Sequence, residues 1–208
     1  MRGRFKKVYQ FKITLKGIRP PIWRRIQVPE NYTFWDLHVA IQDSMGWEDY
    51  HLHEFEIFDP SKGLKVNIGI PPEELGVSFG KETLPGWEER ISDYFSMENR
   101  RAVYVYDFGD NWEHEIVLEK ILPREEGVDY PVCVGGRRAC PPEDCGGVWG
   151  YEEFLEAIAD PDHELHDEML EWVGGEFDPE RFDPEEVVFE DPDRRRRGLL
   201  PIVWPKHR

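Results

Sequence analysis

Apolar and polar positions alternate along the first thirty residues, as they do in half-buried strands. Every second side chain from Tyr9 to Leu15 is apolar, and the positions between them are polar. Successive side chains of a strand point to opposite faces of a sheet, so this period predicts a strand over residues 8–16. A break with Gly and Pro at residues 17–21 precedes a second alternating run over residues 22–28, and together the two runs predict a hairpin.

The period then changes from that of a strand to that of a helix. Thr33 and Asp36 fit the capping-box pattern at the helix start, and Gly46 can end the helix. We predict that this helix, near residues 34–45, packs on the sheet through one stripe of side chains. The stripe is formed by Leu37, Ala40, Ile41, Ser44 and Met45, with the contact to the sheet carried by Leu37, Ile41 and Met45.

More strands follow in the middle of the chain. Residues 53–58 and 64–70 each indicate a strand, whereas the Gly, Pro and charge content of residues 71–100 predicts a long loop with at most one short helix. A second hairpin is predicted over residues 102–121. Its turn, Asp107–Asn111, contains Gly and Asn residues that adopt positive φ easily.

The last third changes character. A loop with two Gly pairs follows Pro123 and leads into a helix predicted from about Tyr151. A further helix is predicted after Asp162 and ends at the Gly pair 174–175. Residues 176–193 are acidic with repeated Asp-Pro pairs, which favours an extended and mobile segment.

This order of elements predicts an α+β fold. We expect a mixed sheet with a β-grasp-like first half, made of hairpin, helix and strands, and a C-terminal helical segment. No internal repeat or linker divides the chain, so one domain over residues 1–185 is expected. Residues 186–208 are expected to form a tail that is either mobile or docked on the domain.

Composition excludes several classes of protein. Eight Trp and twelve Phe supply a core, which excludes a wholly disordered chain. No run approaches the roughly 20 apolar residues that a bilayer span requires, so no membrane partner is expected. The three cysteines, Cys133, Cys140 and Cys145, are odd in number and closely spaced, which suits reduced thiols in a cytoplasmic protein better than a disulfide framework.

The net charge of −17 is unevenly distributed. Residues 1–29 carry nine Lys or Arg and residues 194–208 carry six, with no acid in either segment. The body between them has eleven bases and 43 acids, a charge of −32. The basic ends can contact phosphates, whereas the acidic body repels them. Bases and an aromatic ring interleave on the first hairpin, and the candidate nucleic-acid residues there are Lys12, Lys16, Arg19, Trp23, Arg24 and Arg25.

Four motifs stand in order along the chain. They are Pro20-Pro-Ile-Trp-Arg-Arg25, His51-Leu-His-Glu-Phe55, Tyr106-Asp-Phe-Gly-Asp-Asn-Trp-Glu-His114 and Cys140-Pro-Pro-Glu-Asp-Cys-Gly-Gly-Val-Trp-Gly-Tyr151. On these motifs the chain resembles the Ri-plasmid ORF-3-like family, whose members are often labelled insertion-element passenger or TnpR-like proteins. The resemblance extends from about residue 5 to about residue 185. It implies an α+β fold with a β-grasp-like start and an association with mobile elements, but no settled activity.

We expect the four motifs to converge on one patch, because His, acidic and aromatic residues gathered in separate segments are most simply explained by a common site. No cofactor is expected: the His residues bond to the backbone, the acids organise turns and a helix start, and the thiols are buried. The alternative is a divalent metal such as zinc, which two His side chains and nearby carboxylates suit. The candidate patch comprises His51, His53, Asp107, Asp110, His114, Cys140, Glu143, Asp144, Cys145 and Tyr151.

Two classes of function stay open at the level of the sequence. The first is a cytoplasmic binding or interaction module associated with mobile elements, whose partner is a nucleic acid or a protein. The second is a metal-dependent hydrolase or nuclease that uses the His, Asp and Cys residues of the motifs. A bound stoichiometric metal ion would favour the second class.

Overall fold

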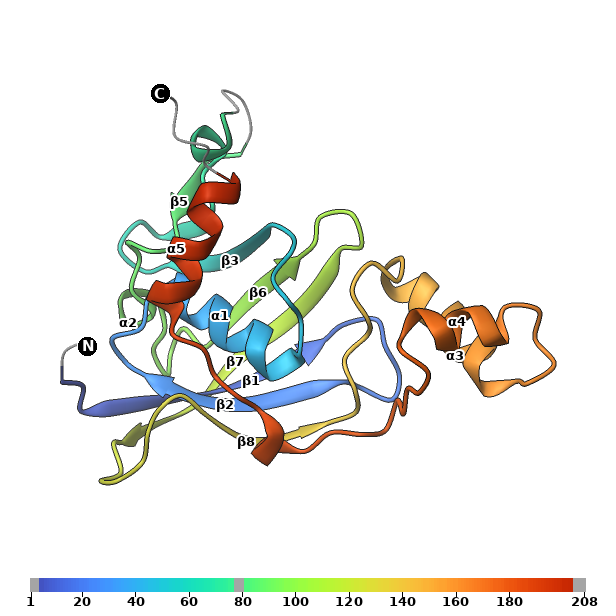
Figure 1. Cartoon of the computed structure of the whole chain (residues 1–208). Helices are drawn as coiled ribbons and strands as arrows, with labels where there is room; N and C mark the ends of the chain where they lie inside the picture. Colours follow the sequence, from blue (N-terminus) through green and yellow to red (C-terminus); the bar gives the residue numbers. More distant parts are fainter. Residues whose placement is uncertain (1–3, 77–80, 204–208) are drawn as a thin grey trace.

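The computed structural model describes residues 4–76 and 81–203 and is built around one sheet of eight strands (Figure 1). The strand order is β5-β4-β3-β6-β7-β1-β2-β8, and every neighbouring pair is antiparallel except the parallel pair β4 and β5. The fold is therefore α+β with a mixed sheet, as the sequence predicts. The strands are β1 Lys7–Leu15, β2 Trp23–Pro29, β3 His53–Asp59, β4 Leu64–Gly69, β5 Thr83–Pro85, β6 Arg101–Tyr106, β7 Trp112–Pro123 and β8 Val132–Arg137.

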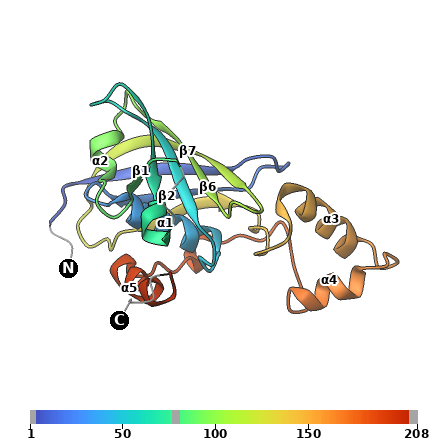
Figure 2. The same ribbon diagram turned by 90° about the horizontal axis from the view of Figure 1, so that it is seen from above.

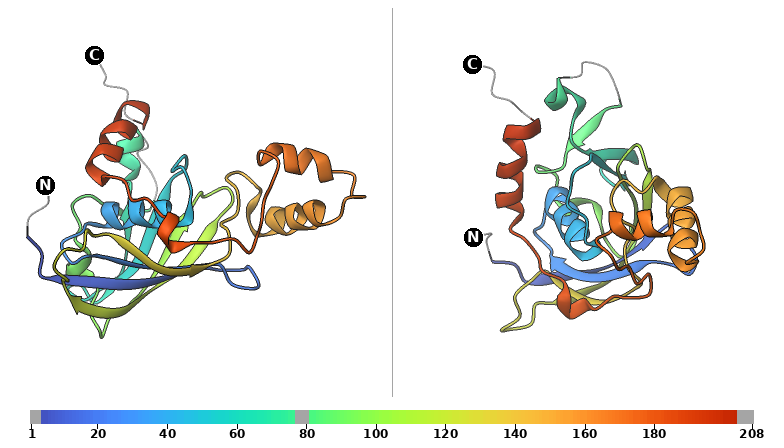
Figure 3. Two further views of the ribbon diagram at one scale, coloured as in Figure 1. Left: turned by 60° about the horizontal axis from the view of Figure 1, so that its bottom comes forward. Right: turned by 45° about the vertical axis from the view of Figure 1, so that its right-hand side comes forward.

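Helix α1, Phe34–Met45, packs on one face of this sheet. Leu37 and Ile41 are completely buried and Met45 is nearly so, which confirms the predicted contact. The predicted capping box is present as well, because the N–H of residue 36 donates to Thr33 Oγ1 and the N–H of Thr33 donates to the Asp36 carboxylate. Contacts of α1 with both β2 and β4, which lie in opposite halves of the sheet, mean that the sheet curves around the helix (Figure 3).

The two predicted hairpins share the sheet side by side. β7 pairs with β1 along its length, so the hairpin of β6 and β7 separates the first hairpin from β3 and β4. The predicted β-grasp-like arrangement of the first half is not confirmed, since those strands do not form a sheet of their own.

Two predictions for the loops are corrected by the structure. Residues 71–100 are not one long loop, because they contain a 3₁₀ turn at Pro72–Leu75, strand β5 and the one-turn helix α2, Ile91–Tyr94. The loop predicted after Pro123 contains β8, whose Gly135-Gly136 pair hides the strand pattern. Gly136 is required there: a Cβ at this position would lie 2.2 Å from the ring of Phe182, which packs across the strand.

Two helices form a hairpin that extends outward from one end of the sheet (Figure 2). They are α3, Gly147–Ala159, and α4, His166–Trp172, and they match the two helices predicted in this region. α3 begins earlier than predicted, because the Gly pair 146–147 takes left-handed φ values and forms the helix start instead of a loop. Phe154 of α3 packs its ring edge-on against both Trp172 of α4 and Phe177, and this packing connects the two helices.

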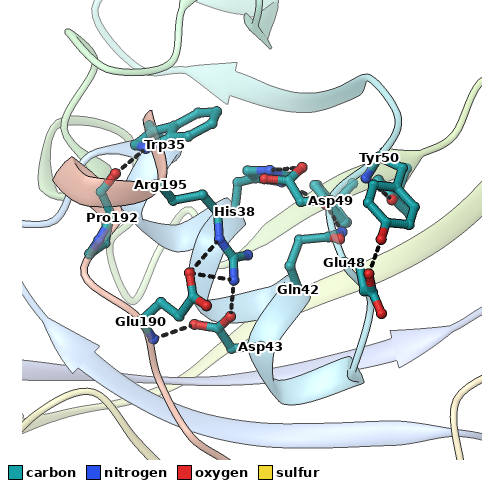
Figure 4. Close-up of polar contacts among 12 residues, drawn as sticks. Trp35, His38, Gln42, Asp43, Glu48, Asp49, Tyr50, Glu190, Pro192 and Arg195 are labelled. Carbon is teal, nitrogen blue, oxygen red and sulfur yellow. Dashed lines mark hydrogen bonds and ion pairs between the residues drawn. The ribbon is translucent and has the colours of Figure 1, made fainter. Parts of the chain in front are cut away.

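Helix α5, Pro192–Val203, follows a 3₁₀ turn at Pro184–Glu186 and lies against α1. The indole of Trp35 donates to the carbonyl of Pro192, and the Arg195 guanidinium lies 2.6 Å from the Asp43 carboxylate (Figure 4). Among the described residues, no helix combines the length and the apolar character needed to cross a bilayer.

Replacing Asp43 by alanine is expected to release α5. Asp43 accepts both the Arg195 guanidinium and the backbone N–H of Glu190, and its side chain is 4% exposed. Without Asp43 the largely buried Arg195 keeps only the exposed Glu190 as a partner among the described residues, and breaking a buried ion pair in this way costs about 3 kcal/mol. Amide hydrogen exchange over residues 193–198 should accelerate in this variant. A Glu126→Ala control should leave it unchanged, and slow exchange in both variants would contradict the docking.

Candidate functional site

Three of the four sequence motifs meet at one corner of the sheet. The segment before β3 meets the turn between β6 and β7, where the N–H of Asp107 donates to the carbonyl of Leu52 at 2.9 Å. The loop before α3 joins them, because the Gly146 N–H donates to the Asp110 carboxylate at 3.0 Å. We call this site the motif corner, and its side chains are His51, Asp107, Asp110, Glu143 and Asp144.

His51 lies between two carboxylates at this corner. Its Nε2 is 2.9 Å from Oδ1 of Asp144 and 3.7 Å from Oδ2 of Asp107. Asp144 is within ion-pair distance of His51, but the angles of this approach are not those of a hydrogen bond. Nε2 of His51 is inaccessible to solvent, and it makes no hydrogen bond to any of the described residues. The three side chains differ in exposure: Asp107 is 10% exposed, His51 28% and Asp144 67%.

Backbone conformation fixes both carboxylates. Asp107 has φ 55° and Asp144 has φ 57°, values in the left-handed region that cost about 1 to 2 kcal/mol for residues with a Cβ. Asp and Asn tolerate this region best because their side chains bond locally. At Asp107 the Oδ1 atom accepts the Gly109 N–H at 2.8 Å, which leaves Oδ2 on the side of His51.

Glu143 ties the loop before α3 to the sheet. Its carboxylate accepts the Tyr106 hydroxyl at 3.0 Å and the backbone N–H of Glu48 at 2.9 Å. The Tyr106 oxygen also accepts the N–H of Tyr50. Burial raises the pKa of Glu143, and the two donors partly oppose that rise by stabilising the charged form. Glu143 therefore links the loop before α3 to β6 and to the segment before β3.

Two of the predicted patch residues lie in the interior instead. His114 is completely buried, edge-on to Trp47, and burial lowers its pKa to about 4. His53 stacks on His38 with the ring centres 3.4 Å apart, and burial lowers its pKa well below the usual value. Both rings are therefore neutral parts of the core at neutral pH, and neither reaches the motif corner.

The two cysteines and the tyrosine of the fourth motif lie behind the corner. Burial raises the pKa of Cys145 to about 12 and also raises that of Cys140. Such thiols are protonated at neutral pH and are poor nucleophiles. Tyr151 is completely buried and stacks on Phe154, and burial raises its pKa to about 12. These three residues support the loop and α3.

A buried polar network was missed by the sequence reasoning. Nδ1 of His38 lies 2.8 Å from the Tyr104 hydroxyl, and its Nε2 lies 2.8 Å from Oδ1 of Asp49 (Figure 4). Gln42 donates to the Tyr104 oxygen, so the tyrosine proton is assigned to the bond with His38, and His38 donates to Asp49. Burial raises the pKa of Asp49 to about 6. The only sequence signal is the helical i, i+4 spacing of His38 and Gln42.

A groove runs between the sheet body and the α3–α4 hairpin, with a volume of about 1050 Å³. A smaller hollow of about 550 Å³ lies between the two helices themselves. We call the larger one the acidic groove. Its aromatic and acidic lining residues include Trp47, Glu48, Tyr50, Glu143, Trp172, Glu176, Phe177, Asp178, Phe182, Asp183 and Glu186.

Comparison with known proteins assigns the chain to a family. The family model described as "Plasmid pRiA4b ORF-3-like protein" matches residues 7–186. The chain belongs to this family. It is 41% identical over 170 residues to the uncharacterized protein y4hQ of Sinorhizobium fredii, covering 80% of this chain and 81% of that protein. It is also similar to a crystal structure from Methanosarcina mazei Go1, the protein of unknown function MM3350, with 55% identity and a TM-score of 0.82 over 89% of this chain and all of that one.

This family member does not present its basic hairpin as a free positive surface. Arg24 is 1% exposed and donates to the carbonyl of Ser44, with its guanidinium over the ring of Phe182. Arg25 makes two bonds to the Glu119 carboxylate. Of the remaining candidates, Lys16 is paired with Glu113, and Arg19 is exposed in the turn. The ammonium group of Lys12 lies 5.2 Å from the centre of the Trp23 ring, which is half-buried.

Proposed function

We propose that this chain is an interaction module that binds a cationic segment of a partner protein in the acidic groove. The observation that carries the proposal is the lining of that groove, which combines aromatic rings with carboxylates. Its two basic lining residues do not offset the charge: Arg24 is buried, and Arg181 is paired with Glu186. A Lys- and Arg-rich segment complements this lining.

Charge on a larger scale supports the same partner. Residues 152–193, which form most of the α3–α4 hairpin and the chain after it, contain eighteen acids and one base, Arg181. A surface of one sign attracts a partner of the opposite sign and raises the rate of association. Tyr50, 67% exposed, and Trp172, 45% exposed, offer aromatic faces for cationic side chains.

The alternatives have less support from the geometry. The acidic lining repels phosphate, and two bases on the first hairpin, Lys16 and Arg25, are already paired with acids of β7, so a nucleic-acid partner is disfavoured. The carboxylates of the motif corner would likewise repel the phosphates of a nucleic acid, which disfavours a nuclease at that corner. An association with mobile elements is supported by the plasmid-derived description of the family.

The proposal is tested by fluorescence anisotropy with a labelled peptide rich in Lys and Arg. We expect binding that weakens as salt is added, because exposed charges are screened. The double variant Glu48→Lys and Glu176→Lys should bind at least about tenfold more weakly, because it places like charges opposite the peptide. The matched control, Glu98→Lys and Glu125→Lys, changes the net charge equally but lies away from the groove.

Two outcomes would contradict the proposal. Equal weakening in both double variants would mean that the peptide responds to net charge and not to the groove. Tighter binding to single-stranded DNA or RNA of similar length than to the peptide would favour the nucleic-acid alternative. A Glu-rich peptide of the same length should show no binding.

A further inference from the structure

We propose that the motif corner holds one divalent transition-metal ion through His51, Asp107 and Asp144. The ligand atoms are Nε2 of His51 and one carboxylate oxygen from each aspartate, and all three lie within 4.8 Å of one another. None of these three ligands lines the acidic groove, so the proposal does not rest on the partner proposed for that groove.

The spacing of these atoms fits a shared ion. Ligands about 2.1 Å from a tetrahedral ion are about 3.4 Å apart. The observed distances from His51 Nε2, 2.9 Å to Asp144 and 3.7 Å to Asp107, lie on either side of that value. The three atoms are therefore close to the spacing that one shared ion requires.

The state of His51 is better explained by a cation than by an ion pair. A His paired with Asp144 would point an N–H at the carboxylate, yet the approach at 2.9 Å lacks hydrogen-bond angles. Nε2 is shielded from solvent and makes no hydrogen bond within the described part of the chain. Buried polar atoms usually have a partner, and an ion between His51 and the two carboxylates would supply one here.

The surroundings hold the ligands in place and leave room for solvent. The Asp107 carboxylate is oriented by the hydrogen bond that it accepts from the Gly109 N–H. The Asp110 carboxylate accepts the Gly146 N–H and so holds the loop that carries Asp144. Asp144 is 67% exposed, so water or another small ligand can complete the coordination. Three protein ligands and an open position are typical of reactive metal sites, whereas structural zinc sites are closed.

The donor set selects the class of metal. One imidazole nitrogen and two carboxylate oxygens suit Zn²⁺ or Mn²⁺ better than Mg²⁺ or Ca²⁺, which prefer oxygen ligands. The other His and Asp group, formed by His38, Asp49 and His53, is less suitable. Both nitrogens of His38 are occupied, and its ring is parallel to that of His53 within 7°, so their lone pairs do not converge on one point.

The test is calorimetric titration of the full chain, without an affinity tag and stripped of metal, with Zn²⁺ and Mn²⁺. We expect one ion per chain, and Asp144→Asn should reduce the affinity at least about tenfold. Asparagine tolerates the left-handed φ of residue 144, and the side chain is exposed, so this variant should keep the fold. Asp162→Asn, on the loop between α3 and α4, is the matched control and should bind as the parent does.

The proposal is overturned if neither metal binds stoichiometrically, or if Asp144→Asn binds as tightly as Asp162→Asn. X-ray absorption spectroscopy at the zinc edge identifies the ligand atoms and is a second test. Scattering from nitrogen and oxygen near 2.0–2.2 Å supports the motif corner, whereas sulfur at about 2.3 Å would assign the ion to the cysteines instead.

Discussion

Replacing Gly147 by alanine is expected to destabilise the protein by about 2 to 5 kcal/mol. Gly147 has φ 69°, a conformation that costs about 1 to 2 kcal/mol for alanine. A Cβ at this position would also lie 2.5 Å from the backbone carbonyl oxygen of Asp110, and overpacking of this kind typically costs about 1 to 3 kcal/mol. The clash falls where the start of α3 meets the turn between β6 and β7, so it opens the motif corner.

A matched control separates the two contributions. Gly174 also has a left-handed φ, 86°, but a Cβ there would meet nothing within 4 Å. Gly174→Ala should therefore cost only the conformational term of about 1 to 2 kcal/mol. Thermal unfolding measures both variants, and Gly147→Ala should lower the midpoint by at least about 4 °C. Equal shifts in the two variants would mean that α3 does not contact the turn as described.

Lowering the pH from 7 to 5 is expected to destabilise the fold through its buried histidines. Burial lowers the pKa of His114 to about 4, and burial lowers the pKa of His38 and His53 as well. A group whose pKa is lower in the folded state stabilises the fold above the unfolded value of 6.5, and that stabilisation is lost as the pH falls toward the folded value. His114 alone should contribute a loss of about 2 kcal/mol at pH 5.

Asp49 opposes this trend. Burial raises its pKa from 3.8 to about 6, so its charge is unfavourable in the fold above pH 6 and protonation relieves that cost on acidification. The relief is about 1 kcal/mol at pH 5, which is smaller than the loss from the histidines together.

Chemical denaturation at pH 7 and pH 5 checks this prediction. His114→Gln removes one titrating ring, so the difference in unfolding free energy between the two pH values should shrink by about 2 kcal/mol. The control His163→Gln, on the loop between α3 and α4, should leave that difference unchanged. A stability that rises between pH 7 and pH 5 would be contrary to the burial of these rings.

Much of the fold was predictable because its strongest elements have local signals. The alternation of β1, the stripe on α1 and the Thr33–Asp36 capping box each reflect one face buried against a neighbour. β8 has no such signal, because its Gly pair leaves room for the distant Phe182. β5 has only three residues and pairs with β4 from a Pro- and Gly-rich segment.

The candidate site was predictable only in part. The motifs around His51, Asp107 and Asp144 carry residue types that suit one site, and the structure brings these three together. His53 and His114 share the same motifs, but strand alternation turns them into the core. The acidic groove depends on the position of the α3–α4 hairpin relative to the sheet, which local periodicity does not encode.

Locating the bound peptide shows directly whether the acidic groove binds a cationic segment. Nuclear magnetic resonance of the isotope-labelled chain during a titration with the Lys- and Arg-rich peptide reports each backbone amide separately. We predict that chemical shifts change first at Glu48, Tyr50, Trp172 and Glu176, and that the changes disappear at high salt. Shift changes confined to the hairpin of β1 and β2, or none at any position, would contradict the proposed binding.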